Sequence, residues 1–363
     1  MGTAVFYVSG HGFGHAARAS QVIGELALTF GHRVVVRTTA PEFLFLRGSA
    51  GLAEKVTVER AEVDQGPSQP DCFTTDFAAT YSRYASMLTS FDGLLEAEFR
   101  HVSRIKPSAV VADISPLGVA VGKRLGVPTF VVANFLWDWI FKDYAKKYPK
   151  FDIISSLLTG IYKEADAILR TPFSGGFEPY SNVVDIPLIA RRSAKSREDA
   201  RRSLGLDENG KYALVSFGGI GAEGFYTGLE DRVTSMELLT LRGTPGRSGR
   251  TISFDGAKVA HEDLVMAADV VIGKLGYGLC AEIAAAGRPI LYTPRNDFVE
   301  YNVLEDGIRK LVPSFCLERD EFFGKSLEPA LAALLKVLCG MAPDPMNGAH
   351  VTAGMINDGM GAL

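Results

Sequence analysis

The sequence has few cysteines and no long apolar run. Its four cysteines, Cys72, Cys280, Cys316 and Cys339, are scattered and form no Cys-x-x-Cys pair. This spacing argues against a structural zinc site and favours a reducing compartment. No stretch approaches the roughly 20 apolar residues of a membrane-spanning helix. The first apolar strand is too short, and too soon broken by glycines, for a secretory signal, so we expect a cytoplasmic protein.

The sequence also lacks an excess of either charge. It has 38 Lys and Arg residues and 42 Asp and Glu residues, for a formal net charge of −4. Such a balance provides no electrostatic footprint for nucleic acid, which we therefore do not expect as a partner. The 363 residues, 47% of them hydrophobic, suffice for two globular domains, each with its own core.

The chain opens with an apolar strand, three alternating glycines and an amphipathic segment. The strand at residues 5–8 runs into Ser9-Gly10-His11-Gly12-Phe13-Gly14-His15, and Arg18 falls on the face of the following helix opposite its apolar residues. A strand, turn and helix in this order direct backbone N–H groups toward a ligand. The helix dipole disfavours a charged imidazole at His15, which could then be a neutral base. Alternatively, His11 and His15 are ordinary turn and cap residues.

These glycines do not form a dinucleotide fingerprint. That pattern needs Gly-x-Gly-x-x-Gly and an acidic residue at the end of the second strand. Gly10 and Gly12 fit, but His15 takes the place of the third glycine, and the strand at residues 34–38 ends without a carboxylate. A nicotinamide-dependent enzyme is therefore not favoured.

Strands and helices alternate through the first half, which predicts a parallel sheet covered by helices on both faces. Strands are expected at residues 4–8, 33–38, 55–59, 109–113, 129–133, 167–170 and 183–185, and one long helix at 75–104. In a doubly wound sheet the fourth strand lies beside the first, so Asp113 should emerge near His15. There it could orient the imidazole, or it could merely cap the helix that starts near Pro116.

Both tryptophans of the protein follow the next strand, within residues 134–141. Aromatic side chains beyond a strand end suit stacking on a sugar or an apolar acceptor. The downstream lysines Lys142, Lys146, Lys147 and Lys150 give a second interpretation, contact with a membrane surface. A third is that the aromatic residues fill a domain core.

The composition changes near Ile189, where a charged run at residues 190–197 is predicted to be a solvated linker and helix surface. A second strand, at residues 212–217, then leads into Gly218-Gly219-Ile220-Gly221. Two such strand and glycine units predict two similar α/β domains that face each other across a cleft. The glycine-containing stretch at residues 236–250 suggests a loop.

Residues 269–302 contain several motifs that suit the binding of a nucleotide sugar. A strand is expected to end at Lys274, followed by a turn with Gly276 and Gly278 that permits close approach of a diphosphate. Glu282 lies about one turn into the next helix, where a carboxylate can accept the hydroxyls of a ribose. The loop at residues 295–302 concentrates polar groups that suit a hexose.

These motifs resemble those of the two-domain GT-B nucleotide-sugar glycosyltransferases, especially the branch that contains the peptidoglycan N-acetylglucosaminyltransferase forming lipid II. The segments Ser9–His15, Asn134–Trp139 and Gly273–Gly278 are also similar to the transferase-like domain ahead of the kinase in plant arabinokinases. The resemblance covers nearly the whole chain. The chain departs from the family pattern between residues 224 and 250, and Lys274 and Tyr277 stand where the lipid II enzyme has small residues.

The resemblance implies an acceptor domain at residues 1–189, a donor domain at 190–345, and a last helix at 346–363 that crosses back to the first domain. It implies that His15 is the catalytic base and Asp113 its partner. The predicted donor site comprises Gly218, Gly219, Lys274, Gly276, Tyr277, Gly278, Glu282, Arg295, Asp297, Glu300 and Asn302. The predicted acceptor site comprises His11, Gly12, Phe13, Asn134, Trp137 and Asp138.

The expected function is an inverting transfer of a sugar from a nucleotide diphosphate, with UDP as first candidate, to an acceptor hydroxyl. No Asp-x-Asp pair occurs in the expected site, so no metal or other cofactor is predicted. Two other functions remain open: a module that binds nucleotide sugars without turnover, and an epimerase with the same fold. The sequence names neither the sugar, the acceptor nor the oligomeric state.

Overall fold

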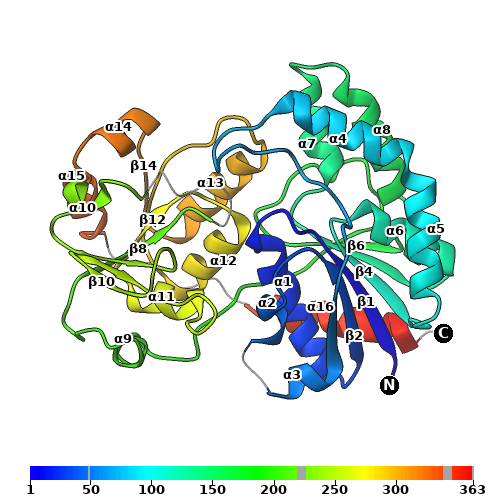
Figure 1. Cartoon of the computed structure of the whole chain (residues 1–363), viewed down its shortest axis with the longest axis horizontal. Coiled ribbons are helices and arrows are strands. Elements are labelled where there is room, and N and C mark those ends of the chain that lie inside the picture. The colour runs from blue at the N-terminus through cyan, green and yellow to red at the C-terminus, as the bar shows by residue number, and fades with distance from the viewer. Residues whose placement is uncertain (48–49, 219–225, 338–345, 362–363) are drawn as a thin grey trace.

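The structure is a computed structural model that describes residues 1–47, 50–218, 226–337 and 346–361. Two α/β domains lie side by side, and both ends of the chain lie at the first domain (Figure 1). The strands of the first domain are β1 (Thr3–Val8), β2 (Arg33–Thr38), β3 (Val56–Arg60), β4 (Ala109–Asp113), β5 (Thr129–Ala133), β6 (Ala167–Arg170) and β7 (Val183–Asp185). Those of the second are β8 (Tyr212–Ser216), β9 (Glu237–Thr240), β10 (Gly246–Ser248), β11 (Thr251–Ser253), β12 (Val270–Gly273), β13 (Ile290–Tyr292) and β14 (Ser314–Cys316).

Helices connect these strands. Up to residue 162 they are α1 (Phe13–Gly24), the π-helical turn η1 (Glu25–Thr29), α2 (Phe43–Leu46), α3 (Ala50–Lys55), α4 (Phe77–Thr89), α5 (Phe91–Val102), α6 (Pro116–Leu125), α7 (Trp137–Ala145) and α8 (Phe151–Tyr162). The others are α9 (Arg197–Ser203), α10 (Leu229–Arg232), α11 (His261–Ala267), α12 (Tyr277–Ala286), α13 (Glu300–Leu311), α14 (Arg319–Gly324), α15 (Glu328–Leu334) and α16 (Gly348–Gly361).

Each domain contains a seven-stranded sheet. The strand orders are β3-β2-β1-β4-β5-β6-β7 and β10-β11-β9-β8-β12-β13-β14. In both sheets the strand order reverses direction next to the first strand of the domain, as in doubly wound folds. Among the described strands, only the β10–β11 pair is antiparallel. The predicted fold class of two Rossmann-like domains is therefore confirmed.

The central strands of the first sheet are buried on both faces, which explains their nearly continuous apolar sequences. On one face, Phe6 and Val8 of β1 pack with residues of α1 and α16. On the other, Val5 and Tyr7 pack with residues of α5 and α6. The alternation follows the two-residue period of a strand. The parallel pairing of β1 with β4, with Val8 opposite Asp113, places the carboxyl ends of both strands at one edge of the sheet.

The last helix, α16, packs against α1, η1 and β4 of the first domain, as its red ribbon in Figure 1 shows. Its first residue, Gly348, donates its N–H to the carbonyl of Leu188 at 3.3 Å. The segment that leads into the second domain is therefore in contact with the helix that returns to the first. A Cβ at Gly348 would lie 2.1 Å from the carbonyl oxygen of Pro187, which only glycine avoids. The predicted boundary at residue 345 lies outside the described residues.

Two sequence predictions of local structure were wrong, and one of the two roles left open for Asp113 is excluded. The helix expected at residues 75–104 is two helices, α4 and α5, with the break at Ser90. The stretch 236–250 contains β9 and β10 in place of a loop. Ser115, whose hydroxyl accepts the N–H of Gly118, caps α6, so Asp113 is not its cap.

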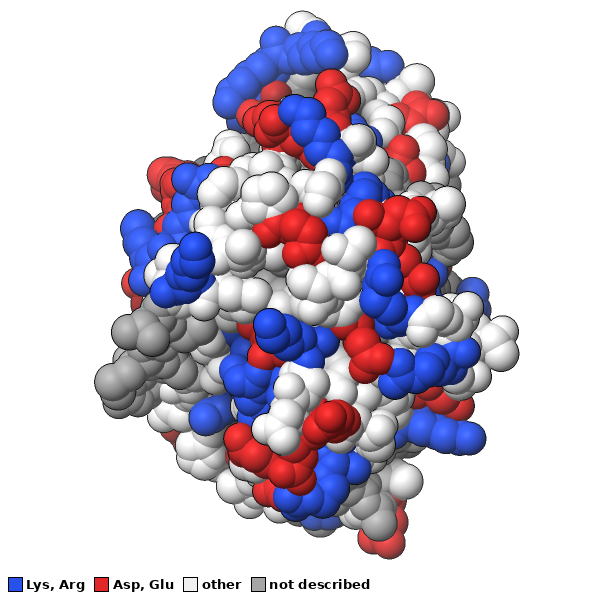
Figure 2. Space-filling view, turned by 90° about the vertical axis from the view of Figure 1, so that its left-hand side faces the viewer, with Lys and Arg blue, Asp and Glu red and all other residues white. Residues whose placement is uncertain are grey.

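Charges of both signs are mixed on one face of the second domain. On the face of the second domain shown in Figure 2, Lys and Arg side chains lie between Asp and Glu side chains. None of the helices in the described part of the chain combines the length and apolar character that crossing a bilayer requires.

Candidate functional site

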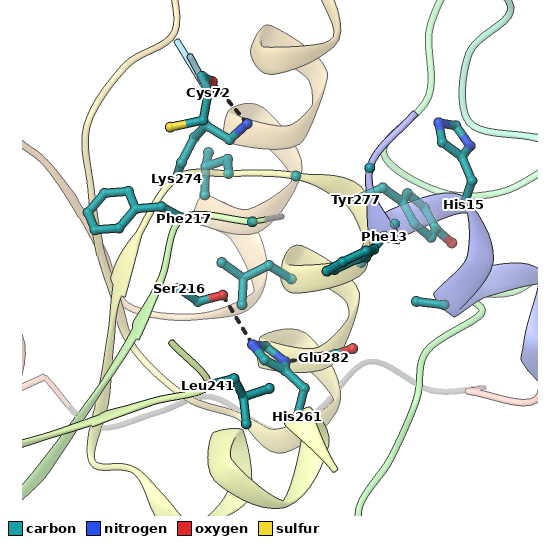
Figure 3. Close-up of a pocket in the computed structure, with 18 of the residues that line it drawn as sticks. Phe13, His15, Cys72, Ser216, Phe217, Leu241, His261, Lys274, Tyr277 and Glu282 are labelled. Atoms are coloured by element: carbon teal, nitrogen blue, oxygen red, sulfur yellow. Dashed lines mark hydrogen bonds and ion pairs between the residues drawn. The ribbon is translucent and has the colours of Figure 1, made fainter. Parts of the chain in front are cut away.

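A cavity of about 500 Å³ lies between the two domains. Residues from the start of α1 and from the loop after β3 line it on the first-domain side, and the carboxyl ends of β8, β12 and β13 line it on the other. Figure 3 shows His15, Phe13 and Tyr277 on one side, Lys274 with Cys72 on a second, and Ser216, His261 and Glu282 on a third. Ligands of doubly wound sheets bind at this edge, where the strand order reverses.

His15 and Asp113 meet at the first-domain side of the cavity. β4 pairs with β1 so that Asp113 lies opposite Val8, and the glycine turn after β1 places His15 in the first turn of α1. The His15 Nδ1 lies 2.7 Å from Asp113 Oδ1, and both residues are buried. The structure therefore brings together the two residues predicted to be the base and its partner.

This pair orients the imidazole. Burial raises the pKa of the Asp113 carboxyl, but Arg18 and His15 outweigh it and keep that pKa below its ordinary value, so the group is a carboxylate. A carboxylate accepts from Nδ1–H, which leaves the lone pair of a neutral imidazole on Nε2. Within the described residues Nε2 has no hydrogen-bond partner, and His15 lines the cavity. The arrangement can accept a proton from a bound hydroxyl.

Arg18 also binds Asp113, a role that the sequence prediction missed. Its Nε donates to Asp113 Oδ2 at 2.9 Å and its Nη2 to Asp113 Oδ1 at 2.7 Å. The helical pattern places Arg18 on the face of α1 opposite its apolar residues, yet Arg18 is only 2% exposed, because Tyr277 of the second domain covers it. Its position three residues after His15, on the same side of the helix, was the available signal.

The same arginine connects the two domains. Its Nη1 donates to Asn134 Oδ1 at 2.7 Å, and Asn134 Nδ2 donates to Glu300 Oε1 of the second domain, also at 2.7 Å. The Arg18 guanidinium carbon lies 4.7 Å from the centre of the Tyr277 ring. A buried chain of polar contacts thus runs from His15 through Asp113, Arg18 and Asn134 to the predicted donor domain.

The opposite side of the cavity contains a second buried carboxylate. Glu282 Oε1 accepts from Arg191 Nε at 2.6 Å, and Oε2 lies 2.5 Å from His261 Nδ1, as Figure 3 shows in part. Burial raises the pKa of Glu282, but Arg191 and His261 outweigh it and lower that pKa to about 2. His261 Nε2 lies 3.1 Å from Ser216 Oγ.

This cluster corrects the prediction for one residue of the charged run, Arg191. Arg191 is largely buried against Glu282 in place of lying on a solvated linker. No local pattern in the sequence marks Arg191, His261 or Ser216, because their partners are distant in the chain. Glu282 lines the cavity where we predicted a ribose contact, and each of its oxygens already accepts one hydrogen bond.

Between these two sides lies the start of α12. Gly276 is its N-cap, and the first N–H groups of an α-helix have no partner within the helix. The helix begins at Tyr277, two residues earlier than predicted. A Cβ at Gly278 would lie 3.4 Å from the Cα of Gly14 on α1, so the two helices approach backbone to backbone. Donors and positive helix ends of both domains thus converge on the cavity.

Most predicted site residues line the cavity. These are His15 and, from the acceptor set, His11, Gly12, Phe13 and Asn134, and from the donor set Gly218, Lys274, Gly276, Tyr277, Gly278, Glu282, Arg295 and Glu300. Gly219 lies outside the described residues. Asp113 lies behind His15 and acts on the cavity only through it.

Four predicted contacts do not line the cavity. Trp137 is fully buried in the first domain and donates to Asp64, and Asp138 accepts from the hydroxyls of Tyr180 and Thr159 within the α7–α8 core. Asn302 is exposed on α13. Asp297 accepts the N–H of Thr75 at 2.6 Å, across the domain junction.

Among the residues that the structure describes, no group of three or more His, Cys, Asp or Glu side chains is arranged to hold a metal ion. The cysteines of that part of the chain, Cys72, Cys280 and Cys316, are unpaired thiols. Cys339 lies outside the described residues.

No protein-family model matches the chain. It is 30% identical to L-arabinokinase of Arabidopsis thaliana over 304 residues, which are 81% of this chain. The chain spans only 28% of the length of that relative. The predicted similarity to plant arabinokinases is thus confirmed.

Solved structures share the whole architecture. The calicheamicin glycosyltransferase CalG4 superposes with a TM-score of 0.65 at 14% identity, over 99% of this chain and 98% of that chain. MurG of Acinetobacter baumannii superposes with a TM-score of 0.58 at 14% identity, over 99% of this chain and 100% of its own. With two Rossmann-like domains facing across a cavity, the chain has the GT-B fold that these glycosyltransferases share.

Proposed function

We propose that this protein transfers a sugar from a nucleotide diphosphate to the hydroxyl group of an acceptor, with inversion at the anomeric carbon and without a metal ion. The observation that carries the proposal is the orientation of His15. Its Nδ1 is held by the buried carboxylate of Asp113, and its Nε2 is left for a ligand in a cavity shared by two domains. The fold and the similarity to glycosyltransferases of known structure support the same assignment.

In the proposed step, His15 Nε2 removes the proton from the acceptor hydroxyl as its oxygen attacks the anomeric carbon. The bond between that carbon and the diphosphate oxygen breaks, and the nucleotide diphosphate leaves with the electron pair. Asp113 stabilises the imidazolium that forms, and Arg18 keeps the carboxylate ionised and in place. A single displacement of this kind inverts the configuration.

The second domain would hold the donor. The start of α12 supplies backbone donors for the diphosphate, whose negative charge grows as the bond breaks. Glu282 lies where the ribose is predicted, held in place by Arg191 and His261. Positive charge from the helix start supports transfer without a metal. UDP is our first candidate for the nucleotide, because the resemblance to the lipid II-forming branch suggests it.

Calorimetric titration with UDP, GDP, dTDP and their sugars, without metal, tests the donor site. We expect one nucleotide to bind, and the variant Glu282→Ala to weaken it. The variant His15→Ala should bind that nucleotide as the wild type does but lose release of the diphosphate from the nucleotide sugar. Unchanged turnover in His15→Ala would refute the assignment of the base. Conversion of the nucleotide sugar into an epimer without any acceptor would indicate an epimerase. Binding of the nucleotide sugar without turnover would indicate a regulatory module.

A further inference from the structure

Two basic side chains mark one end of the cavity. Lys274 follows β12 and Arg295 follows β13, and these strands are parallel neighbours, so both residues emerge at the same edge of the sheet. Arg295 is 9% exposed and Lys274 is partly buried. The Lys274 Nζ donates to the carbonyl oxygen of Cys72 at 3.1 Å, a contact drawn in Figure 3. An ammonium group has two further N–H donors.

Hydrogen-bond donors at this end are left without acceptors. Within the described residues, the buried Nε and Nη2 of Arg295 and the buried Nε2 of Gln69 have no hydrogen-bond partner. Gln69 lies in the loop after β3 and lines the same cavity. A buried donor without a partner is unfavourable, and more so when it is charged, so a ligand that supplies acceptors here binds favourably.

The nearby carboxylates do not fill these positions. Asp297 Oδ1 lies 3.5 Å from Arg295 Nε and makes no hydrogen bond with it, while Oδ2 accepts the N–H of Thr75. Glu300 Oε1 accepts from Asn134. Asp297 forms an ion pair with Arg295 at Nε, at a distance too long for a hydrogen bond, and Nη2 of the guanidinium is left without an acceptor in the described residues.

Burial, and after it the nearby positive charges, lower the pKa values of two neighbouring groups. Burial, His15, Arg295 and Lys274 together lower the pKa of His11 to about 3, so its imidazole is neutral. Burial and Arg295 lower the pKa of Lys274 to about 8.

Lys274 and Glu282 lie on either side of the start of α12 in the chain. In Figure 3 the Lys274–Cys72 contact and the pair His261 and Glu282 lie on different sides of the pocket. A donor with its ribose at Glu282 and its diphosphate at Gly276 would therefore present its sugar to Lys274 and Arg295. The Nε and Nη2 edge of a guanidinium matches the two oxygens of a carboxylate.

We propose that Lys274 and Arg295 bind the carboxylate of an acidic sugar, so that the donor is a nucleotide-activated uronic acid. This inference rests on the proposed function, because it assumes that the second domain holds a nucleotide sugar.

Calorimetry with pairs of donors that differ only at C6 tests this inference. UDP-glucose is compared with UDP-glucuronate, UDP-galactose with UDP-galacturonate, and UDP serves as reference; the equivalent pair is used if another nucleotide binds. We expect one uronate to bind about tenfold to a hundredfold more tightly than its neutral counterpart, the range for hydrogen bonds to a charged group. Arg295→Gln and Lys274→Met should remove this preference and leave the affinity for UDP within about twofold. Lys258→Met, at an exposed lysine of the same domain, is the matched control and should keep the preference.

The outcomes separate the two proposals. Equal affinity for both members of each pair in the wild type overturns the inference but leaves the proposed function standing. An equal loss of UDP affinity in Arg295→Gln and Lys274→Met also overturns it, because these residues would then bind the diphosphate. Failure of every nucleotide to bind refutes the proposed function, and this inference with it. Circular dichroism and thermal unfolding establish that each variant is folded.

Discussion

Asp113→Asn is the most informative single substitution, because Asp113 serves two neighbours at once. Its Oδ1 is 2.7 Å from both His15 Nδ1 and Arg18 Nη2, and its Oδ2 accepts from Arg18 Nε. An asparagine has only one acceptor oxygen in this place. If its NH2 group faces Arg18 Nε, two hydrogen-bond donors oppose each other. If the NH2 group faces His15 Nδ1, it forces the imidazole proton onto Nε2, and Nε2 loses the lone pair that accepts the proton of the acceptor hydroxyl.

The size of the effect follows from these contacts. Losing the charge-assisted hydrogen bond to the imidazolium costs about 1.5–3 kcal/mol in the transition state, which lowers kcat by about tenfold to a hundredfold. The wrong tautomer raises the loss toward about 10⁴-fold. Arg18, 2% exposed, also loses its counter-ion, which destabilises the fold by about 3–5 kcal/mol.

The assay is the release of nucleotide diphosphate from the donor, measured on folded protein and alongside the affinity for the nucleotide. Glu98→Gln is the control, because Glu98 also forms a two-point pair with an arginine, accepting from Arg37 Nε at 3.1 Å and Nη2 at 2.5 Å, but lies away from the cavity. We expect both variants to unfold more easily and only Asp113→Asn to lose turnover. If folded Asp113→Asn turned over within threefold of the wild type, the role given to this carboxylate would be wrong.

Three further predictions concern pH and packing. Because the pKa of Glu282 is lowered to about 2, its pairing with Arg191 stabilises the fold above the ordinary glutamate value and is lost as the pH falls toward 2. Glu282→Gln should therefore cost about 3 kcal/mol in urea unfolding at pH 7, and the difference from the wild type should shrink between pH 5 and 3. The preference for a uronate should weaken as the pH rises through about 8, where free Lys274 loses its charge, and titration at pH 6.5 and 9.5 measures this. Gly278→Ala should be tolerated, since its Cβ would lie 3.4 Å from the Cα of Gly14, whereas Gly278→Val should lower stability by about 1–3 kcal/mol and weaken nucleotide binding in the same calorimetric assay.

The sequence was sufficient for the position of His15 relative to Asp113. Apolar strands and a glycine turn predicted the sheet, and the topology of doubly wound sheets places the ends of the first and fourth strands side by side. This reasoning needs only elements that are close in the chain and one general rule about their order. The distance of 2.7 Å between the two side chains agrees with it.

Contacts between elements far apart in the chain could not be predicted in this way. Hydrophobic periodicity assigns a polar residue such as Arg18 or Arg191 to solvent, because it registers only the packing of one local segment. In the structure the other domain supplies Tyr277 for Arg18, and Glu282 pairs with Arg191. The break at Ser90 was missed for a different reason, since neither proline nor glycine marks it.

The return of α16 to the first domain has a consequence for synthesis on the ribosome. The core built around β1 includes Ala353 and Ile356, which are made some 350 residues after the strand they help to cover. Domains usually fold in the order in which they emerge. Here the first domain to emerge is the last to be completed. Until α16 is made, the apolar face of α1 that it covers is exposed.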